Sequence, residues 1–318
     1  MVISEFGPPN VLQPTEVPEP VPGPGDVLID VEVVNITFVE TQLRAGKSPN
    51  PAMLPQLPAI PGNGVGGTVL AVGEGVDPVL VGRRVVSSTG GTGAYAERVA
   101  VDAAGLIEVP GELELADAVA LLADGRTAML LMRGAEVRTD ETVLVEAAAG
   151  GVGSLLVQLC RNAGAQVVAA AGGGRKLELA SELGAGLTVD YTEPDWTQAI
   201  KAQLGGVDVA FDGVGGEIGR AAFDLVRPAG RFSVFGLASG QFTEIPDEEA
   251  ARRGISVIRG SRVAPEEMLE LTRAALAEAA AGRLRPVVGQ TFPLDRAADA
   301  HAAIEARATI GKTLLLTR

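Results

Sequence analysis

The pattern of apolar and polar residues divides the chain into two parts. Up to about residue 115, short β-branched runs such as 27–33 and 67–72 are bounded by Gly and Pro. Short strands with such boundaries predict a β-rich, barrel-like domain. From Leu115 onward, apolar strand-like runs alternate with helical stretches of roughly 10–15 residues. That alternation indicates βαβ units and a buried parallel sheet.

The predicted strands of the second part are short and almost wholly apolar. They lie at residues 142–147, 165–171, 187–190, 207–212, 230–235 and 255–259. Two helices at 265–281 and 295–307 and a strand at 313–317 follow. Because this tail is too small to stand alone, we expect it to complete the first domain. The predicted organisation is therefore a β-rich domain of residues 1–118 and 260–318, split around a doubly wound nucleotide-binding domain at 119–259.

Composition narrows the classes of partner. The 318 residues are about twice the ~150 of a typical domain, which fits two domains. A net charge of −14 without a basic block disfavours nucleic acid and anionic lipid. No apolar run approaches the ~20 residues of a membrane helix, and the N-terminus does not resemble a secretory signal. We expect a soluble, cytoplasmic protein whose partners are small molecules and a second copy of itself.

A glycine-rich turn links the strand at 142–147 to the next helix. It contains Gly150, Gly151, Val152 and Gly153. Glycine is favoured where a turn is tight and the backbone approaches a pyrophosphate, and a helix N-terminus offers free N–H groups to the anion. The flanking strand and helix distinguish this motif from a lone glycine triplet. The alternative is a glycine-rich loop that merely turns.

The second strand of this unit ends without an acidic residue. In NAD-preferring folds, an Asp or Glu about 20 residues beyond the first glycine takes the ribose hydroxyls. Here residues 169–174 are all Ala or Gly, and Arg175 and Lys176 follow. Small residues such as Gly173 leave room for a 2′-phosphate, which the two cations can bind. These residues predict NADPH as the cofactor, unless Arg175 and Lys176 are merely solvated in a first helical turn.

The segment around the turn resembles the quinone oxidoreductase (zeta-crystallin-like) branch of the medium-chain dehydrogenase/reductase superfamily. The matching positions are Asp140, Glu141, Leu144, Ala148, Ala149, Gly150, Gly151, Gly153, Gln158 and Arg161. Further similar segments lie at 36–46, 93–97, 125–128, 207–216 and 235–236. The resemblance implies an α/β protein with a GroES-like, β-barrel-like catalytic domain, split in sequence, around a Rossmann cofactor domain.

The resemblance also implies roles for individual residues. Gly150, Gly151, Val152 and Gly153 would cradle the pyrophosphate. Lys176 and Tyr191 would hold the 2′-phosphate of NADPH. The residues near the nicotinamide would be Thr127, Phe235 and Gly236, and Arg307 would reach the cofactor.

The chain departs from zinc-dependent relatives at the positions of their ligands. Those relatives place a cysteine at the position of Thr37 and a His-Glu pair at that of Asn63 and Gly64, so we expect no metal site. Cys160, the only cysteine, lies at helical spacing with apolar neighbours and is expected to pack in the core. His301, the only histidine, is expected to be structural or on the surface.

The chain also departs from the quinone reductases at the acceptor side. They commonly have asparagine at the position of Thr37 and aspartate at that of Glu40. Related enoyl reductases carry a tyrosine, proposed as a proton donor, at the position of Phe38, and phenylalanine cannot donate. We expect hydride transfer from NADPH to a quinone or an α,β-unsaturated carbonyl, with Thr37, Arg44 or Tyr95 orienting or polarising the acceptor oxygen.

Two other functions and one mode of assembly are also consistent with the sequence. One alternative is a non-enzymatic NADPH-binding or redox-sensing protein, and the other is a zinc alcohol dehydrogenase, which the missing ligands disfavour. The family commonly forms homodimers by joining edge strands of the nucleotide domain. The β-prone run within residues 230–239 is the expected edge.

Overall fold

The computed structural model describes residues 1–48, 50–260 and 263–318, and the chain forms two compact units. The first unit comprises Met1–Arg126 and Leu269–Arg318, and the second comprises Thr127–Met268. One unit is thus split in sequence around the other. The predicted boundary at residue 118 falls inside helix α2 (Leu115–Ala135), because a continuous helix carries the chain from the first unit into the second.

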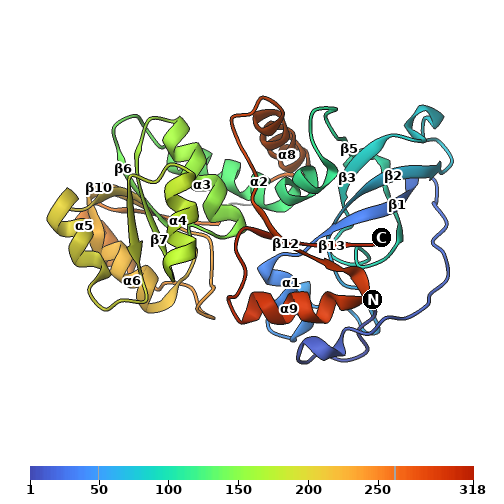
Figure 1. The fold of residues 1–318 in the computed structure, drawn as a ribbon, viewed down its shortest axis with the longest axis horizontal. Coiled ribbons are helices and arrows are strands. Elements are labelled where there is room, and N and C mark those ends of the chain that lie inside the picture. Colours follow the sequence, from blue (N-terminus) through green and yellow to red (C-terminus); the bar gives the residue numbers. More distant parts are fainter. Residues whose placement is uncertain (49, 261–262) are drawn as a thin grey trace. The chain divides into compact units, whose positions relative to one another are not determined.

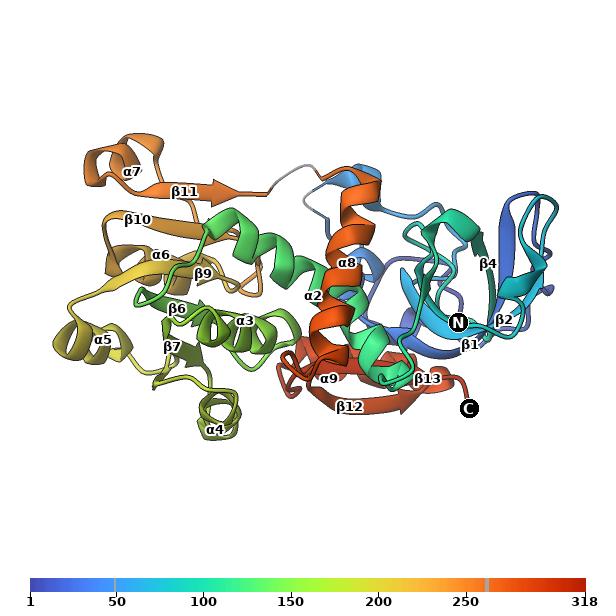
Figure 2. The same ribbon diagram turned by 90° about the horizontal axis from the view of Figure 1, so that it is seen from above.

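The first unit is built on a sheet whose strands come from both ends of the chain (Figure 2). The strands are β1 (Asp26–Asn35), β2 (Gly64–Val72), β3 (Arg84–Ser88), β4 (Arg98–Asp102), β5 (Ile107–Glu108), β12 (Val288–Pro293) and β13 (Lys312–Leu316). Their order is β12-β13-β1-β2-β3-β5. Strand β4 pairs with the first half of β1, and β13 pairs with its second half. The C-terminal segment therefore completes the β-rich domain.

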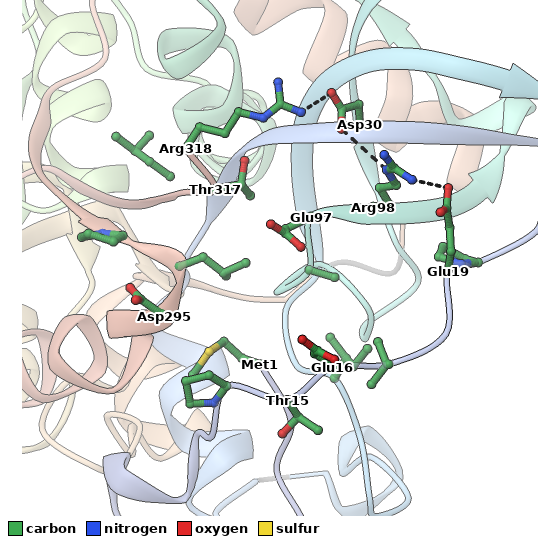
Figure 3. Close-up of a pocket in the computed structure, with 18 of the residues that line it drawn as sticks. Met1, Thr15, Glu16, Glu19, Asp30, Glu97, Arg98, Asp295, Thr317 and Arg318 are labelled. Carbon is green, nitrogen blue, oxygen red and sulfur yellow. Dashed lines mark hydrogen bonds and ion pairs between the residues drawn. The ribbon is translucent and has the colours of Figure 1, made fainter.

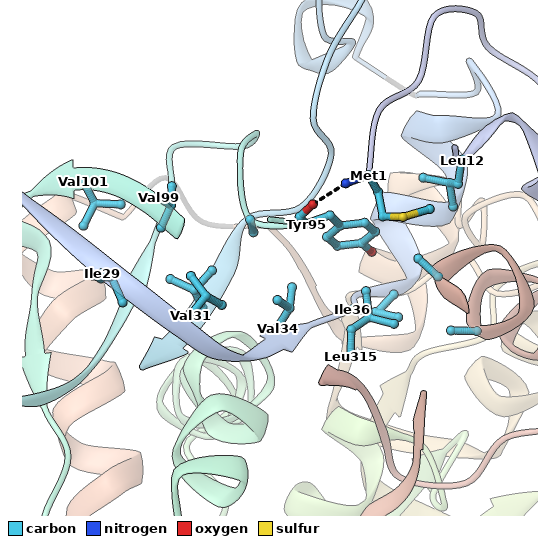
Figure 4. Packing of buried hydrophobic residues seen from close by; sticks show 14 of the residues in the cluster. Met1, Leu12, Ile29, Val31, Val34, Ile36, Tyr95, Val99, Val101 and Leu315 are labelled. Carbon is cyan, nitrogen blue, oxygen red and sulfur yellow. Dashed lines mark hydrogen bonds between the residues drawn. The ribbon is translucent and has the colours of Figure 1, made fainter. Parts of the chain in front are cut away.

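Apolar side chains of β1 fill the core of this unit (Figure 4). Ile29, Val31 and Val34 pack in one cluster with Tyr95 and with Leu315 of β13. Helices α1 (Phe38–Arg44), α8 (Pro265–Ala280) and α9 (Ala297–Glu305) accompany the sheet. The described part of the chain also contains five 3₁₀ turns: Pro9–Val11, Pro51–Met53, Pro78–Leu80, Ala103–Gly105 and Leu294–Arg296.

The second unit is a parallel sheet with helices on both faces. Its strands are β6 (Thr142–Glu146), β7 (Gln166–Ala171), β8 (Leu187–Asp190), β9 (Val207–Asp212), β10 (Val226–Val234) and β11 (Ser256–Arg259), in the order β11-β10-β9-β6-β7-β8. Helices α3 (Gly151–Asn162) and α4 (Gly174–Glu182) lie on one side, and α5 (Trp196–Leu204) and α6 (Gly216–Leu225) lie on the other (Figure 1). Helix α7 (Asp247–Arg253) precedes β11. This doubly wound topology confirms the predicted fold class.

The predicted edge strand is wrong. Strand β10 pairs with β9 on one side and with β11 on the other, so it lies in the interior of the sheet. Phe232 and Val234 are buried, as is usual for an interior parallel strand covered on both faces. A β-prone run is equally typical of interior and edge strands, which is why the sequence pattern misled. The edge on this side is β11, whose Ser256 and Arg259 are exposed.

No helix in the described parts of the chain is both long and apolar enough to cross a membrane.

Candidate functional site

The glycine turn has the geometry of an anion cradle. Strand β6 ends just before the turn, and helix α3 begins at Gly151 with Gly150 as its N-cap. A Cβ atom at Gly153 would lie 2.2 Å from the carbonyl oxygen of Ala147, so only glycine fits there. The N–H groups in the first turn of an α-helix have no intrahelical carbonyl to bind, and here they belong to Gly151, Val152 and Gly153. The turn therefore fits a pyrophosphate at a helix N-terminus.

The ends of β7 and β8 bring together four residues predicted from the sequence. Gly173 has a φ of +91° and leads into α4, whose first turn contains exposed Arg175 and half-buried Lys176. Tyr191 follows the neighbouring strand β8, and its ring lies 3.3 Å from the place of a Cβ at Gly172. A Cβ at Gly173 would meet no atom within 4 Å. Two cations and a phenol therefore belong to one edge of the sheet, beside an open turn.

An acid that sequence reasoning missed also reaches this edge. Asp190 is the last residue of β8, and its carboxylate accepts hydrogen bonds from the backbone N–H groups of Gly173 and Thr192, each at 2.9 Å. The Thr192 hydroxyl donates to it at 2.6 Å, and that bond is the main cause that lowers the pKa of Asp190. Ala171, the last residue of β7, is paired with Asp190, the last residue of β8. The acid that β7 lacks at its end is therefore present at the end of the neighbouring strand.

A second missed feature lies at the ends of β6 and β9. Glu146 and Asp212 are both fully buried, and each is the last residue of its strand. The backbone carbonyl of Asp212 accepts hydrogen bonds from the N–H groups of Phe235 and Gly236, at 3.0 and 3.1 Å. This places the two residues predicted to lie near the nicotinamide against the end of β9. The signal in the sequence is an acid that ends each of two apolar runs.

The two remaining predicted cofactor residues lie in different units of the chain. Thr127 lies in α2 and is the first residue of the second unit. Arg307 follows α9 in the first unit, is exposed, and has a φ of +54°. The roles of these two residues remain predictions.

In the first unit, a buried carboxylate organises the residues at the predicted acceptor side. Glu40 is 5% exposed, and its carboxylate accepts hydrogen bonds from the backbone N–H groups of Thr37 at 2.6 Å and Asn63 at 2.8 Å. Burial raises the pKa of Glu40, while those bonds and the charge of Lys312 oppose the shift. Lys312 is itself buried and donates to Asp124 at 2.9 Å. Glu40 thus joins the start of α1 to the loop that precedes β2.

Thr37 is half-buried and caps α1. Its side-chain oxygen accepts a hydrogen bond from the N–H of Glu40, in a reciprocal capping box. The hydroxyl also lies within hydrogen-bond reach of the Glu40 carboxylate. Thr37 therefore presents a hydroxyl whose position is fixed by the helix start and by a buried acid.

Arg44 and Tyr95, to which we assigned a role at the acceptor, are both buried. Arg44 is 1% exposed, and its guanidinium donates to the carbonyl of Gly7 and to the carboxylate of Glu305. Tyr95 is fully buried, and its hydroxyl lies 2.8 Å from Nε2 of His301. Both polar groups are therefore engaged by partners inside the unit, and a contact of either with an acceptor stays a prediction. Partners distant in sequence bury both side chains.

His301 extends this buried network. The Tyr95 hydroxyl donates to the Glu40 carboxylate at 3.5 Å, so Tyr95 lies between the acid and the imidazole. Nδ1 of His301 has no hydrogen-bond partner among the described residues. Burial, with a smaller contribution from the charge of Arg44, lowers the pKa of His301 to about 3. The imidazole is thus neutral and buried, which contradicts the surface alternative.

Cys160 packs inside the second unit. Its thiol is buried in α3, with Sγ 3.5 Å from the sulfur of Met132. Burial raises the pKa of this thiol to about 12. Across residues 1–48, 50–260 and 263–318, no three His, Cys, Asp or Glu side chains come together as a metal-binding group.

A groove of about 1200 Å³ lies elsewhere on the first unit (Figure 3). The segment at 14–20, β12 and the C-terminal residues line it. Asp30 forms ion pairs with Arg98 and Arg318, and Arg98 also pairs with Glu19. The residues that line the groove include none of those predicted for the cofactor or the acceptor.

Comparison with known proteins adds a family to this geometry. The alcohol dehydrogenase GroES-like domain family matches residues 23–111, and the zinc-binding dehydrogenase family matches residues 151–277. A 2-haloacrylate reductase of a Burkholderia species is 32% identical, with 99% of this chain and 98% of that protein covered. A quinone oxidoreductase of Pseudomonas aeruginosa is 31% identical, with 98% and 97% covered. The structure of Escherichia coli quinone oxidoreductase complexed with NADPH matches with a TM-score of 0.90 and 30% identity, over 99% of this chain and 98% of that one.

Proposed function

Because this chain belongs to the quinone oxidoreductase branch of the medium-chain dehydrogenase/reductase superfamily, we propose that it transfers a hydride from NADPH to a quinone or an α,β-unsaturated carbonyl. The observation that carries the choice of cofactor is the end of β7. Gly173, Arg175 and Lys176 follow that strand where NAD-preferring folds have an acid. The relative from Escherichia coli whose structure contains NADPH supports the same choice.

The proposed cofactor site has two parts, the N-terminus of α3 and the residues that follow β7 and β8. The N-terminus of α3, from Gly150 to Gly153, binds the pyrophosphate through backbone N–H groups and the helix dipole. Lys176 supplies a point charge and Arg175 a planar fork to the 2′-phosphate, with Tyr191 beside them. Asp190 holds the N–H of Gly173, so the phosphate is bound by side chains rather than by that amide.

On the acceptor side, Thr37 is the residue we propose to contact the acceptor oxygen. NADPH supplies the hydride, and the protein must orient the acceptor and polarise its carbonyl. The Thr37 hydroxyl is half-buried, and Glu40 holds the backbone of Thr37 through a 2.6 Å hydrogen bond. We assign Glu40 a positioning role, because its carboxylate is turned toward backbone N–H groups. Solvent delivers the proton.

The reaction is proposed to need no metal. The positions that hold zinc ligands in zinc-dependent relatives are Thr37, Asn63 and Gly64 in this chain. The side-chain oxygen of Asn63 accepts a hydrogen bond from the N–H of Gly91 at 2.7 Å, which uses it to shape the loop. A lone hydroxyl and an engaged amide do not make a zinc site, because zinc takes three or four Cys, His or carboxylate ligands.

A homodimer through β11 is proposed in place of the predicted pairing through β10. Strand β11 is short and, among the described residues, pairs only with β10, so its outer side is the edge of the described sheet. Pairing with the same strand of a second copy would extend the sheet by two-fold symmetry. Sedimentation should give a dimer for the wild type, and Ser256→Pro, which removes a backbone N–H from this strand, should shift it toward the monomer.

Turnover tests the proposed reaction. Purified protein, NADPH and a panel of quinones, enones and 2-haloacrylates should show acceptor-dependent oxidation of NADPH. The 2-haloacrylates are included because one relative is a 2-haloacrylate reductase. Tight binding of NADPH without turnover of any acceptor would favour the alternative, a non-enzymatic NADPH-binding protein. Stoichiometric zinc in active protein would contradict the metal-free mechanism.

A charge substitution tests the cofactor site. Lys176→Ala should weaken NADPH binding by about tenfold or more, which is ~1.4 kcal/mol or more, and should leave NADH binding nearly unchanged. Lys201→Ala removes an exposed lysine on α5 and serves as the matched control. Equal weakening of NADPH and NADH by Lys176→Ala would contradict the 2′-phosphate role.

A further inference from the structure

The buried acids Glu146 and Asp212 converge on a single backbone donor. The N–H of Val214 donates to Oε2 of Glu146 at 3.2 Å and to Oδ1 of Asp212 at 3.1 Å. The N–H of Gly215 donates to the same Asp212 oxygen at 2.7 Å. The two carboxyl groups lie within hydrogen-bond reach of each other, and both residues are 0% exposed. The two side chains therefore form a carboxyl pair beneath the loop that follows β9.

Among the described residues, the donors that reach this carboxyl pair are the backbone N–H groups of Gly213, Val214 and Gly215, which leave one oxygen of each carboxyl group without a donor. Oε1 of Glu146 and Oδ2 of Asp212 have no hydrogen-bond partner among the described residues. Two carboxylates that share a buried site cannot both ionise without a large penalty. Burial, followed by the charge of Asp212, raises the pKa of Glu146 well above its ordinary value. A proton held between the two groups satisfies an oxygen that otherwise lacks a donor.

The elements packed around the pair within the second unit bring no cation to neutralise it, as far as the described residues extend. Strand β10 contributes the neutral Ser233, and the segment after it contributes the neutral Thr243, whose hydroxyl oxygens are buried without a partner. Helix α3 has no charged residue before Arg161, which donates to the carbonyl of Leu183. On α6, the charged residues Glu217 and Arg220 line a surface hollow with Glu244.

The pair holds two segments at the proposed cofactor edge. Its oxygens bind the N–H groups of Val214 and Gly215, and the Asp212 carbonyl binds those of Phe235 and Gly236. Glu146 also directly precedes the turn that leads into α3. The residues that carry the pair are thus joined by backbone to the segments proposed for the nicotinamide and for the pyrophosphate.

We propose that Glu146 and Asp212 are positioning residues that share one proton, and that the shared proton keeps the strand ends in the geometry that binds NADPH. This inference rests on the cofactor site proposed above. Loss of the proton adds a second buried negative charge beside the site of a polyanion, and the loop at 213–216 can relieve the repulsion only by moving.

The direction of the pH dependence follows from linkage. The complex holds the proton more firmly than the free protein does, so binding is strongest below the pKa of the pair in the free protein. Above that pKa the dissociation constant for NADPH should rise by up to tenfold per pH unit. The 2′-phosphate of NADPH has a second pKa of about 6, so it is already ionised above about pH 7 and does not contribute there.

The experiment measures the dissociation constant for NADPH from about pH 7 to 10, by fluorescence, in three proteins. The wild type should bind more weakly as the pH rises. Glu146→Gln supplies an amide donor in place of the proton and should bind with less than about twofold change over the range. Asp208→Asn changes an acid at the opposite end of β9 and should retain the wild-type profile. If Glu146→Gln does not fold, Asp212→Asn tests the same point.

Infrared difference spectra give a readout that does not depend on variants binding NADPH. The wild type at about pH 8 should have the carbonyl band of a protonated carboxyl group, and Glu146→Gln should lack it. A missing band in the wild type, a flat wild-type profile, or identical profiles in wild type and Glu146→Gln would overturn the inference. Failure of the wild type to bind NADPH at pH 7 would instead overturn the proposed cofactor site.

Discussion

Acidification to pH 5 should destabilise the protein through its single histidine. His301 is fully buried in α9, where its Nε2 is paired with the Tyr95 hydroxyl. Burial, and to a smaller extent the charge of Arg44, lowers the pKa of this imidazole to about 3, against about 6.5 in the unfolded chain. Between about pH 6.5 and pH 3, His301 is therefore protonated in the unfolded chain and neutral in the folded protein.

The size of the effect follows from that difference. For a group with a lowered pKa in the folded state, protonation favours the unfolded state. The stability is therefore fully present above pH 6.5 and is lost as the pH falls toward 3. Each pH unit corresponds to about 1.4 kcal/mol, so the loss from His301 alone is about 2 kcal/mol between pH 7.5 and pH 5. Glu40, whose pKa is raised mainly by burial, contributes in the opposite direction.

Comparison with His301→Gln isolates this contribution. Chemical denaturation at pH 7.5 and pH 5 should give a decrease in the free energy of unfolding that is about 2 kcal/mol larger in the wild type than in the variant. In tag-free protein, the ring resonance of this sole histidine should remain that of a neutral imidazole down to pH 5. Equal decreases in the two proteins, or a resonance that titrates near pH 6.5, would refute the reasoning.

Three further predictions concern other parts of the fold. Gly153→Ala should weaken NADPH binding by about tenfold or more, because its Cβ would lie 2.2 Å from the carbonyl oxygen of Ala147. The control variant Gly134→Ala, whose new Cβ would have its nearest contact at 3.9 Å, should bind NADPH normally. Equal NADPH binding by both variants would contradict the close approach at Gly153. Lys312→Met should lower the free energy of unfolding by about 3–5 kcal/mol, because it leaves Asp124 buried without its partner. The double variant Lys312→Met with Asp124→Leu should recover most of that loss. If the losses of the two single variants simply add in the double variant, the pair is not coupled as described. Cys160 should react with a thiol reagent only after denaturation, because the thiol is buried and burial raises its pKa to about 12; rapid labelling of the folded protein would disprove this.

Sequence patterns predicted most of the fold, because strands, helices and tight turns depend mainly on residues that are close together in the chain. The apolar runs that became β6 to β9 alternate with helical stretches, and that alternation is enough to indicate a parallel sheet. The glycine turn was predictable because the group that leaves no room for a Cβ at Gly153, the carbonyl oxygen of Ala147, is close to it in sequence. The position of β10 was not predictable, since a β-prone run does not state how many neighbours the strand has.

The buried polar contacts could not be read from the sequence, because their partners are far apart along the chain. Tyr95 and His301 are separated by 206 positions, and Arg44 and Glu305 by 261. The family resemblance suggested a role at the acceptor for Arg44 and Tyr95, and only the packing of α1 against α9 reveals their partners. Glu146 and Asp212 meet because β6 and β9 are neighbours in the sheet although β7 and β8 lie between them in sequence.

Transfer of deuterium from NADPH labelled at C4 of the nicotinamide tests the central claim most directly. With an α,β-unsaturated ketone as acceptor, one of the two C4-deuterated epimers should give product that carries deuterium on the β-carbon, as mass spectrometry and NMR can establish. The other epimer should give unlabelled product, because the cofactor is bound in one orientation. Deuterium in the product from neither epimer, with no oxidation of NADPH by any quinone, would contradict the proposed hydride transfer.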